Sequence, residues 1–228
     1  MNALRSLTYA LIFYVGSAPY CLAALLIAPR SKRAALAIPR AWAQFQHWCA
    51  RWLMGTHLVV EGTIPQHDVI VAIKHESFYE TFQTLRLFDK PAVVFKAELL
   101  KVPVWGEVAR MQGVIPIERE AGAKALRQLL VASRAAVADG RAIVIFPEGT
   151  RVPHGEAPLL RPGIAGLYKM LGLPIVPIAV DTGRTWGFKS FWKRAGVVTF
   201  RVGAPIPLGL DRDEVEARVH AAINVLNH

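Results

Sequence analysis

Residues 69–80 read Val69-Ile-Val-Ala-Ile-Lys-His-Glu-Ser-Phe-Tyr-Glu80, an apolar run that changes abruptly into a polar one. The first five residues are apolar and mostly β-branched, which predicts a buried strand. The polar residues stand at the carboxyl end of that strand, where open α/β sheets place their active sites. The segment therefore predicts a central strand together with a candidate functional site.

Strands and helices alternate along the rest of the chain after Gly55. Gly140 and Gly172 are predicted to end helices, and Asp211 with Glu214 three residues on is predicted to cap the last one. This alternation predicts an α/β fold with a mostly parallel sheet flanked by helices. The predicted strands are 57–61, 69–73, 92–95, 114–117, 142–146, 175–180 and 197–202, and the predicted helices are 77–88, 104–111, 122–139, 163–171 and 212–226.

The N-terminal segment has the composition of a membrane-associated helix. Residues 6–29 carry no charge, and roughly 20 predominantly apolar residues suffice to span a bilayer. Gly16 and Pro19 interrupt the run, and a mid-helix proline removes a backbone hydrogen bond. Two shapes are open, a kinked span and a helix that enters the bilayer and turns back. A cleaved signal peptide is a third interpretation, although its basic start is thin and no clear small-x-small cleavage site follows.

Charge and composition narrow the setting. The basic flank at residues 30–33 outweighs the single Arg5 before the apolar run, so the positive-inside rule places the rest of the chain in the cytoplasm. The formal net charge of +10 suits an anionic partner. Cys21 and Cys49 form no disulfide framework and no metal-ligand cluster. We predict membrane-anchoring helices over residues 1–54 and one catalytic domain over residues 55–228.

Two aromatic-rich segments have two interpretations each. Residues 40–54 place Trp and Phe at helical spacing before Gly55, which is expected to end that helix. This helix either packs its aromatic face on the domain or lies at the membrane interface, where Trp prefers to sit. Residues 186–194 interleave aromatics with Lys and Arg. They either load onto a bilayer surface or tuck their aromatics against the sheet.

His75 and Glu80 form the first candidate catalytic pair. Ser77 and Glu80 fit an S-x-x-E capping box, which folds the Glu carboxylate back toward the residues before the helix, His75 among them. A carboxylate on one imidazole nitrogen fixes the tautomer and leaves the other nitrogen free as a base. The alternative is that Glu80 only caps the helix. No Ser or Cys is evidently placed as a nucleophile, which favours direct attack by the hydroxyl of an acceptor.

A second candidate loop is Phe146-Pro-Glu-Gly-Thr-Arg151, which follows a predicted strand at once. Gly149 permits a tight turn that other residues resist. Thr150 and Arg151 offer donors for a phosphate, and Glu148 offers an acceptor for a hydroxyl group. The alternative is a surface loop with a helix-stabilising ion pair.

A third candidate is Arg119, at the end of Gly113-Val-Ile-Pro-Ile-Glu-Arg119. A helix is expected to begin near Ala121, and a helix N-terminus attracts anions. Arg119 therefore predicts a phosphate site, with a plain solvated Arg as the alternative.

Taken together, these segments resemble the glycerolipid acyltransferase family, whose bacterial member converts lysophosphatidic acid to phosphatidic acid. The one departure is Glu80, where the family pattern has Asp; Glu keeps the charge and reaches one methylene further. The matching motifs are His-x4-Asp at 75–80, Gly-x-Ile-x-Ile-x-Arg at 113–119, Phe-Pro-Glu-Gly-Thr-Arg at 146–151 and Pro-Ile-Val-Pro at 174–177, within residues 55–205.

The resemblance implies a role for each motif. His75 is expected to deprotonate the sn-2 hydroxyl of lysophosphatidic acid, Glu80 to orient His75, and Arg119 to bind the phosphate. The expected co-substrate is acyl-CoA or acyl-carrier protein, with no metal and no other cofactor. The expected location is the bacterial inner membrane, with the catalytic domain on the cytoplasmic side. The acceptor site is expected to include Phe146, Pro147, Glu148, Gly149, Thr150 and Arg151, the last as a second phosphate ligand.

Three other functions compete with this one. The same reaction can use another acceptor, such as lyso-ornithine lipid, another lysophospholipid or glycerol 3-phosphate. A non-catalytic membrane protein that binds acidic lipid through its basic face fits the composition. Nucleic-acid binding fits only the charge, because the chain lacks a recognition helix or an aromatic strand motif.

Overall fold

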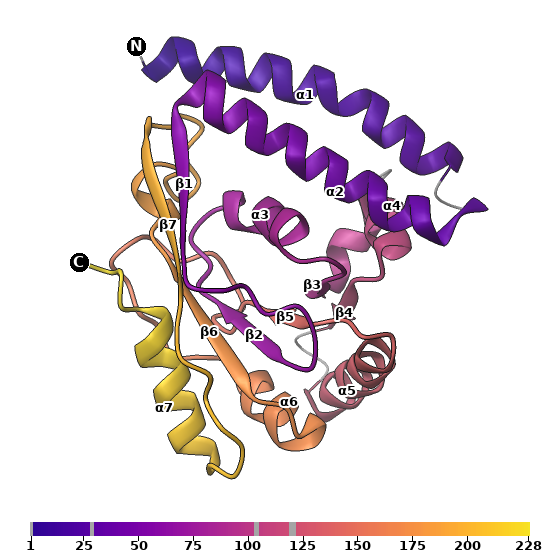
Figure 1. Cartoon of the computed structure of the whole chain (residues 1–228), viewed down its shortest axis with the longest axis vertical. Coiled ribbons are helices and arrows are strands. Elements are labelled where there is room, and N and C mark those ends of the chain that lie inside the picture. Colours follow the sequence, from indigo (N-terminus) through magenta and orange to yellow (C-terminus); the bar gives the residue numbers. More distant parts are fainter. Residues whose placement is uncertain (1, 28–29, 103–104, 119–121) are drawn as a thin grey trace.

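The computed structural model describes residues 2–27, 30–102, 105–118 and 122–228. A seven-stranded sheet runs through the centre, in the order β1-β7-β6-β2-β5-β3-β4 (Figure 1). Neighbouring strands pair in parallel except β6 with β7, so the predicted mostly parallel sheet is confirmed. The strands are β1 (Thr56–Glu61), β2 (Ile70–Ile73), β3 (Ala92–Lys96), β4 (Ile115–Ile117), β5 (Ile143–Ile145), β6 (Ile175–Val180) and β7 (Gly196–Val202).

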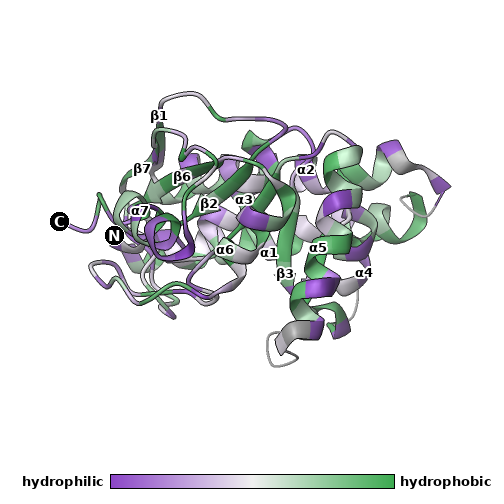
Figure 2. Ribbon diagram, turned by 90° about the horizontal axis from the view of Figure 1, so that it is seen from below, coloured by the Kyte–Doolittle hydropathy of each residue, from purple (hydrophilic) through white to green (hydrophobic). Residues whose placement is uncertain are grey.

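Helices cover both faces of this sheet (Figures 1 and 2). Side chains alternate across a strand, so Val71 and Ile73 of β2 join the core beneath α1–α3, whereas Ile70 and Ala72 join the core beneath α5–α7. Burial on both faces explains why β2 is apolar throughout. The helices are α1 (Asn2–Ile27), α2 (Lys32–Cys49), a π-helical turn (Ala50–Met54), α3 (Tyr79–Leu87), η3 (Ala97–Lys101), α4 (Trp105–Gln112), α5 (Gly122–Ala138), α6 (Gly163–Leu171), η5 (Thr182–Arg184) and α7 (Arg212–Ile223).

Several predicted boundaries were wrong by one to three residues. The helix expected from residue 77 begins at Tyr79, because the Ser77 hydroxyl accepts a hydrogen bond from the Tyr79 amide and holds the preceding turn open. The last helix ends at Ile223, three residues earlier than expected. The cap predicted at Asp211 is confirmed, since its carboxylate accepts from the Glu214 amide at 2.8 Å. Gly172 ends α6 in the left-handed conformation, as predicted.

The interruption predicted at Gly16 and Pro19 does not break α1, which continues through both residues and lies beside α2 (Figure 1). Gly16 is needed for this packing, since a Cβ there would lie 2.4 Å from Phe45 Cζ. The Trp42 indole N–H also donates to Ser17 Oγ at 2.8 Å. Among the described helices, α1 is the one long and apolar enough to cross a membrane.

The α1–α2 pair shares a core with the sheet. Tyr9 and Phe13 of α1 belong to the same buried cluster as Val71 of β2 and Ile178 of β6. The predicted division between residues 54 and 55 therefore separates two segments that pack together, and it stays a prediction. Gly55 does end the second helical segment, with a φ of 73°.

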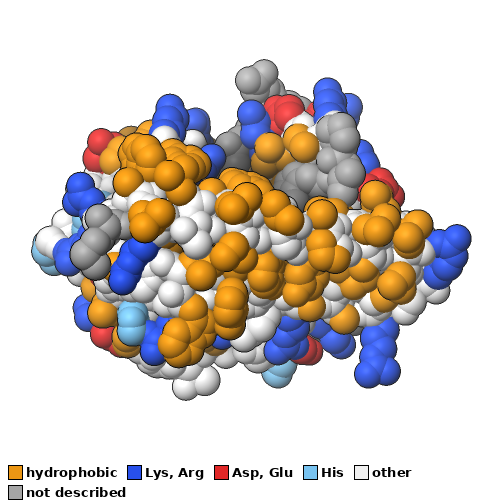
Figure 3. Space-filling model, turned by 90° about the horizontal axis from the view of Figure 1, so that it is seen from above, with side chains coloured by type: hydrophobic (Ala, Val, Ile, Leu, Met, Phe, Trp, Pro, Cys, Tyr) orange, Lys and Arg blue, Asp and Glu red, His pale blue; other side chains and the backbone are white. Residues whose placement is uncertain are grey.

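One face of α1 carries large apolar side chains that nothing in the described part of the chain covers. Figure 3 shows hydrophobic side chains spread along this side of the molecule, with Lys and Arg mainly toward its edges. The exposed residues on α1 include Leu4, Leu7, Leu11, Val15 and Leu22.

Both interpretations of residues 40–54 hold in part. Trp42 packs on the core, whereas Trp48 and Trp52 are exposed.

Candidate active site

His75 lies two residues beyond the end of β2, at the carboxyl edge of the sheet. Its Nδ1 lies 2.9 Å from Oε1 of Glu80, and its ring stacks on Phe146 with 4.2 Å between ring centroids. The His75 side chain is 17% exposed, whereas that of Glu80 is fully buried. The structure thus brings the two residues of the predicted pair into direct contact, with the imidazole on the side that solvent reaches.

Glu80 is held as an anion by the protein around it. Five hydrogen bonds reach its carboxylate, from His75 Nδ1, the Glu76 amide, the Ser77 amide, the Ser77 hydroxyl and the Thr182 hydroxyl. Burial alone raises the pKa of a carboxyl group, but here the bonds from His75 and Ser77 outweigh it and hold the pKa of Glu80 below its ordinary value. Glu80 can therefore orient the imidazole as a carboxylate.

Glu148 holds the backbone of His75 from the other side. Its Oε2 accepts a hydrogen bond from the His75 amide at 2.7 Å, and its Oε1 lies 3.1 Å from Nζ of Lys74. Lys74 and Glu148 have fully buried side chains, and Lys74 also donates to Oδ1 of Asn224, directly after α7, at 2.7 Å. Burial raises the pKa of Glu148 despite its neighbour Lys74. The sequence predicted that Glu148 accepts a hydrogen bond from a substrate hydroxyl group. In the structure, both of its carboxylate oxygens instead accept from donors of the protein, Lys74 and the His75 amide.

The order of the sheet explains why these residues meet. The strands β5, β2 and β6 lie side by side and run parallel, so their carboxyl ends reach the same edge. His75 follows β2, Glu148 follows β5, and Thr182 follows β6. Three segments far apart in the sequence therefore converge on one imidazole.

The predicted loop after β5 divides between buried and exposed residues. Phe146 is half-buried against His75, while Pro147 and Gly149 are buried. Gly149 has a φ of 75°, and a Cβ there would lie 3.0 Å from Cγ of Arg161, so glycine suits both the backbone and the space. The two predicted phosphate donors, Thr150 and Arg151, are exposed. The prediction for Arg119 lies outside the described residues.

Comparison with known proteins settles the family. A family model described as Acyltransferase matches residues 57–181, more than half of the chain. The chain belongs to this family. The match contains both residues of the His75–Glu80 pair and the whole loop at 146–151.

Two curated relatives of the chain carry the same name. A 1-acyl-sn-glycerol-3-phosphate acyltransferase from Pseudomonas aeruginosa is 33% identical over 71% of this chain and 64% of the relative. One from Cocos nucifera is 27% identical over 68% of this chain and 51% of the relative. The chain thus matches about half to two-thirds of the length of these relatives.

A solved structure shares the fold. The crystal structure of the 1-acyl-sn-glycerophosphate (LPA) acyltransferase PlsC from Thermotoga maritima aligns over 98% of this chain and 95% of that one. The TM-score is 0.75 at 22% sequence identity. The likeness covers the N-terminal helices as well as the sheet.

A second histidine–carboxylate pair lies beside the first in this acyltransferase-family chain. His154 Nδ1 lies 2.9 Å from Oε1 of Glu76, and the Gly183 amide donates to the other oxygen of Glu76 at 2.7 Å. Arg184 Nε donates to His154 Nε2 at 2.9 Å. Burial raises the pKa of Glu76 to about 8 and lowers that of His154. This cluster ties the loops after β2, β5 and β6 together.

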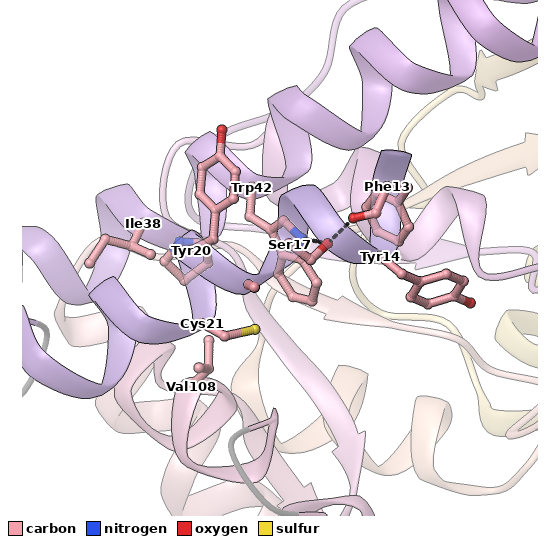
Figure 4. A pocket seen from close by; sticks show the side chains of 10 residues that line it. Phe13, Tyr14, Ser17, Tyr20, Cys21, Ile38, Trp42 and Val108 are labelled. Carbon is pink, nitrogen blue, oxygen red and sulfur yellow. Dashed lines mark hydrogen bonds between the residues drawn. The ribbon is translucent and has the colours of Figure 1, made fainter. Parts of the chain in front are cut away.

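Two pockets lie along helix α1, and one of them borders the site. One of about 280 Å³ is lined by Ser77, Phe78 and Arg151 together with residues of α1 and of the loop after η5. The other, of about 300 Å³, has mainly apolar walls from α1, α2 and α4, with Cys21 and Trp42 among its lining (Figure 4). None of the predicted site residues lines the second pocket.

Sequence reasoning missed four residues of this site. Lys74 carried a usable signal, since a charged residue directly after a fully apolar strand needs a buried partner. Glu76, His154 and Thr182 carried none, because their partners lie on loops 78 and 102 positions away in the chain.

Proposed function

We propose that the protein transfers a fatty acyl group to the sn-2 hydroxyl of lysophosphatidic acid, giving phosphatidic acid. His75 is the general base in this proposal, and Glu80 orients it. Membership of the acyltransferase family and the name that the Pseudomonas aeruginosa and Cocos nucifera relatives share support the reaction class. The donor is a thioester, acyl-CoA or acyl-carrier protein.

The proposal rests on the hydrogen bonding of the two ring nitrogens of His75. Nδ1 is engaged by an ionised, fully buried Glu80, which fixes the proton on Nδ1. Among the described residues, none forms a hydrogen bond with Nε2. A base needs such an open nitrogen, held in one orientation, with a negative charge behind it to stabilise the imidazolium that forms.

The proposed reaction runs in two steps at one carbon. Nε2 of His75 takes the proton of the acceptor hydroxyl while that oxygen bonds to the thioester carbonyl carbon. The tetrahedral intermediate then collapses, the carbon–sulfur bond breaks, and the leaving thiolate takes the proton from His75. The products are an ester and a free thiol, and His75 returns to its starting state.

Direct transfer is favoured over an acyl-enzyme intermediate. The Ser77 hydroxyl donates to Glu80 at 2.6 Å and accepts from the Tyr79 amide at 3.0 Å. The Thr182 hydroxyl also donates to Glu80, at 2.8 Å. Both hydroxyls beside the pair are thus committed to Glu80, whereas a protein nucleophile needs its proton directed at the base.

The α1–α2 pair is proposed to seat the protein on the cytoplasmic face of the bacterial inner membrane. The exposed apolar face of α1 supports its insertion into the membrane. Its packing against the sheet supports a helix that lies in the membrane interface and is not cleaved off as a signal peptide. Both substrates carry acyl chains, so this position brings the site to them. Sodium carbonate washing of membranes tests it: the chain stays in the pellet, and release into the supernatant contradicts the proposal.

The test of function is acyl transfer by the purified protein in mixed micelles, with acyl-CoA and acyl-carrier protein as separate donors. Lysophosphatidic acid, lyso-ornithine lipid, lysophosphatidylcholine and glycerol 3-phosphate serve as acceptors. We expect the highest kcat/KM with lysophosphatidic acid and a loss of ~10²–10⁴-fold in His75→Ala. A wild-type rate in His75→Ala contradicts the mechanism, and preference for another acceptor contradicts the substrate.

A further inference from the structure

A cationic pocket adjoins the His75–Glu80 pair, with a volume of about 280 Å³. Ser77 and Phe78, which follow His75 closely in the chain, form one wall. Arg151 reaches it from the loop after β5, and Lys193 from the loop after η5. Helix α1 supplies the remaining wall, so the pocket lies between the candidate active site and the N-terminal helices.

The charges of this pocket do not balance. Its described lining contains Arg151, Lys189 and Lys193, and no Asp or Glu. No described carboxylate lies within ion-pair distance of Lys193. Positive charges gathered without a counter-charge favour an anion that arrives from outside.

Lys193 is unusual among these cations because it is buried, with 7% of its surface exposed. Its Nζ lies 5.5 Å from the ring centroid of Phe78 and 5.8 Å from that of Trp186, and it donates to the Ser190 carbonyl. Burial and the neighbouring charge of Arg151 hold the pKa of Lys193 below its ordinary value. A buried ammonium group beside another cation is costly unless a ligand compensates it.

Helix α1 fixes the position of this lysine. Ser6, which is buried, accepts a hydrogen bond from the Lys193 amide at 2.9 Å and donates to the Lys193 carbonyl at 3.4 Å. The same helix lines the pocket with Tyr9 and Tyr14 and carries the exposed apolar face. The ligand of such a pocket is an amphiphile, with an anionic group at Lys193 and an apolar part toward α1.

We propose that Lys193, held by Ser6 of α1, binds the phosphate of the lysolipid acceptor together with Arg151 and selects for phosphate-bearing acceptors. This inference rests on the proposed function and adds a specificity-determining residue to it. The phosphates of the thioester donor share the same chemistry. The acceptor is favoured because one wall of the pocket is the apolar helix α1.

Lys193→Met tests the proposal, because it keeps the length and removes the charge. Loss of a charge-assisted phosphate contact is expected to raise the apparent KM for lysophosphatidic acid ~10-fold or more. The preference for lysophosphatidic acid over monoacylglycerol, which lacks the phosphate, should fall by a similar factor. Lys193→Arg should retain most of both. Lys169→Met, at an exposed position of α6 on the other face of the sheet, is the matched control and should leave both unchanged.

The same measurements distinguish the two phosphate sources. If Lys193→Met raises the apparent KM for acyl-CoA and leaves that for lysophosphatidic acid unchanged, the residue serves the donor and the proposal is wrong. Ser6→Ala is the second variant, since it keeps the charge of Lys193 and removes the hydrogen bonds between Ser6 and the Lys193 backbone. It should raise the KM for lysophosphatidic acid several-fold, less than Lys193→Met does.

Direct binding separates this proposal from the proposed function. The probe is lysophosphatidic acid in detergent micelles, compared with monoacylglycerol, at equilibrium with purified protein whose folding is checked by thermal unfolding. Lysophosphatidic acid binding that depends on Lys193, in a wild type without acyl transfer, upholds the site and overturns the function. Acyl transfer by wild type with equal lysophosphatidic acid binding by Lys193→Met upholds the function and overturns the site.

Discussion

The two histidine–carboxylate pairs have almost the same local geometry. His75 and His154 each place Nδ1 2.9 Å from a buried Glu, and their side chains are 17% and 18% exposed. They differ in what surrounds the pair. Glu80 receives five hydrogen bonds and has a lowered pKa, whereas Glu76 receives two and has a pKa raised to about 8.

The other ring nitrogen separates the pairs further. Nε2 of His154 is occupied by Arg184, whereas Nε2 of His75 has no hydrogen-bond partner in the described part of the chain. A base needs both an ionised carboxylate behind it and an open nitrogen in front. The distance between a histidine and a carboxylate therefore does not identify a catalytic pair. The proposed mechanism selects His75 by the donors on its carboxylate partner and by its open second nitrogen.

The largest expected contrast is between His75→Ala and His154→Ala. We expect kcat/KM for lysophosphatidic acid to fall ~10²–10⁴-fold in the first and less than about tenfold in the second, because only His75 has an open Nε2. Steady-state kinetics on both purified variants makes the comparison, with thermal unfolding as the check on folding. Equal losses would mean that His154 shares the chemistry.

Replacing each glutamate by glutamine is expected to give a smaller difference in kcat between the His75–Glu80 pair and the His154–Glu76 pair. Glu80→Gln removes the charge behind His75 and should lower kcat by ~10²-fold with little change in KM. Glu76→Gln should lower kcat less than about tenfold, because Glu76 contacts no reacting group. Separate kcat and KM values decide the point. A larger loss in Glu76→Gln than in Glu80→Gln would reverse the assignment.

The two carboxylates should affect stability in opposite pH ranges. The pKa of Glu76 is raised from 4.5 to about 8, so between these values the folded state holds a proton that the unfolded chain has lost. The free energy of unfolding then falls with rising pH, by at most about 1.4 kcal/mol per unit from this group. The lowered pKa of Glu80 stabilises the fold above the ordinary value, and that contribution is lost as pH falls through the folded value.

Urea unfolding of wild type, Glu76→Gln and Glu80→Gln at several pH values measures this difference. Glu76→Gln should flatten the decline between pH 4.5 and 8, and Glu80→Gln should change the profile only on the acid side. Parallel profiles for wild type and Glu76→Gln would contradict the raised pKa.

The smallest expected effect comes from removing one hydrogen-bond donor to Glu80. Thr182→Val keeps the shape of the side chain and removes one of the bonds to Glu80. A single hydrogen bond to a charged group is worth ~1.5–3 kcal/mol before the cavity relaxes, so we expect a several-fold loss in kcat. Thr185→Val is the control, because among the described residues the Thr185 hydroxyl bonds only to the Thr182 carbonyl, at 3.3 Å. Similar kcat values for both variants would show that this donor is dispensable.

Much of the fold followed from local pattern. Apolar strands, glycine helix ends and the Asp211 cap depend on neighbouring residues in the chain, and they appeared close to the predicted positions. The sequence left open a kinked span and a helix that turns back near Gly16 and Pro19; α1 continues through both residues, packed along α2. Tertiary contacts overrode the local preference there.

The candidate site shows the same division. The S-x-x-E spacing predicted that Glu80 turns back toward His75, since four bonds of the turn involve only residues 75–80. The contact of Lys74 with Asn224 joins residues 150 positions apart, and no spacing predicts it. The cationic pocket likewise combines α1 with three loops that follow different strands.

By itself, the sequence determined the strands, the turns after them and the pairing of His75 with Glu80, because these depend on hydrogen bonds between near neighbours. The tertiary structure decided which His–Glu pair keeps an open nitrogen, which carboxylate stays ionised and which lysine is buried beside Arg151. Those properties depend on burial and on the order of β5, β2 and β6 in the sheet. That order is set by the packing of the whole chain, which no single segment specifies.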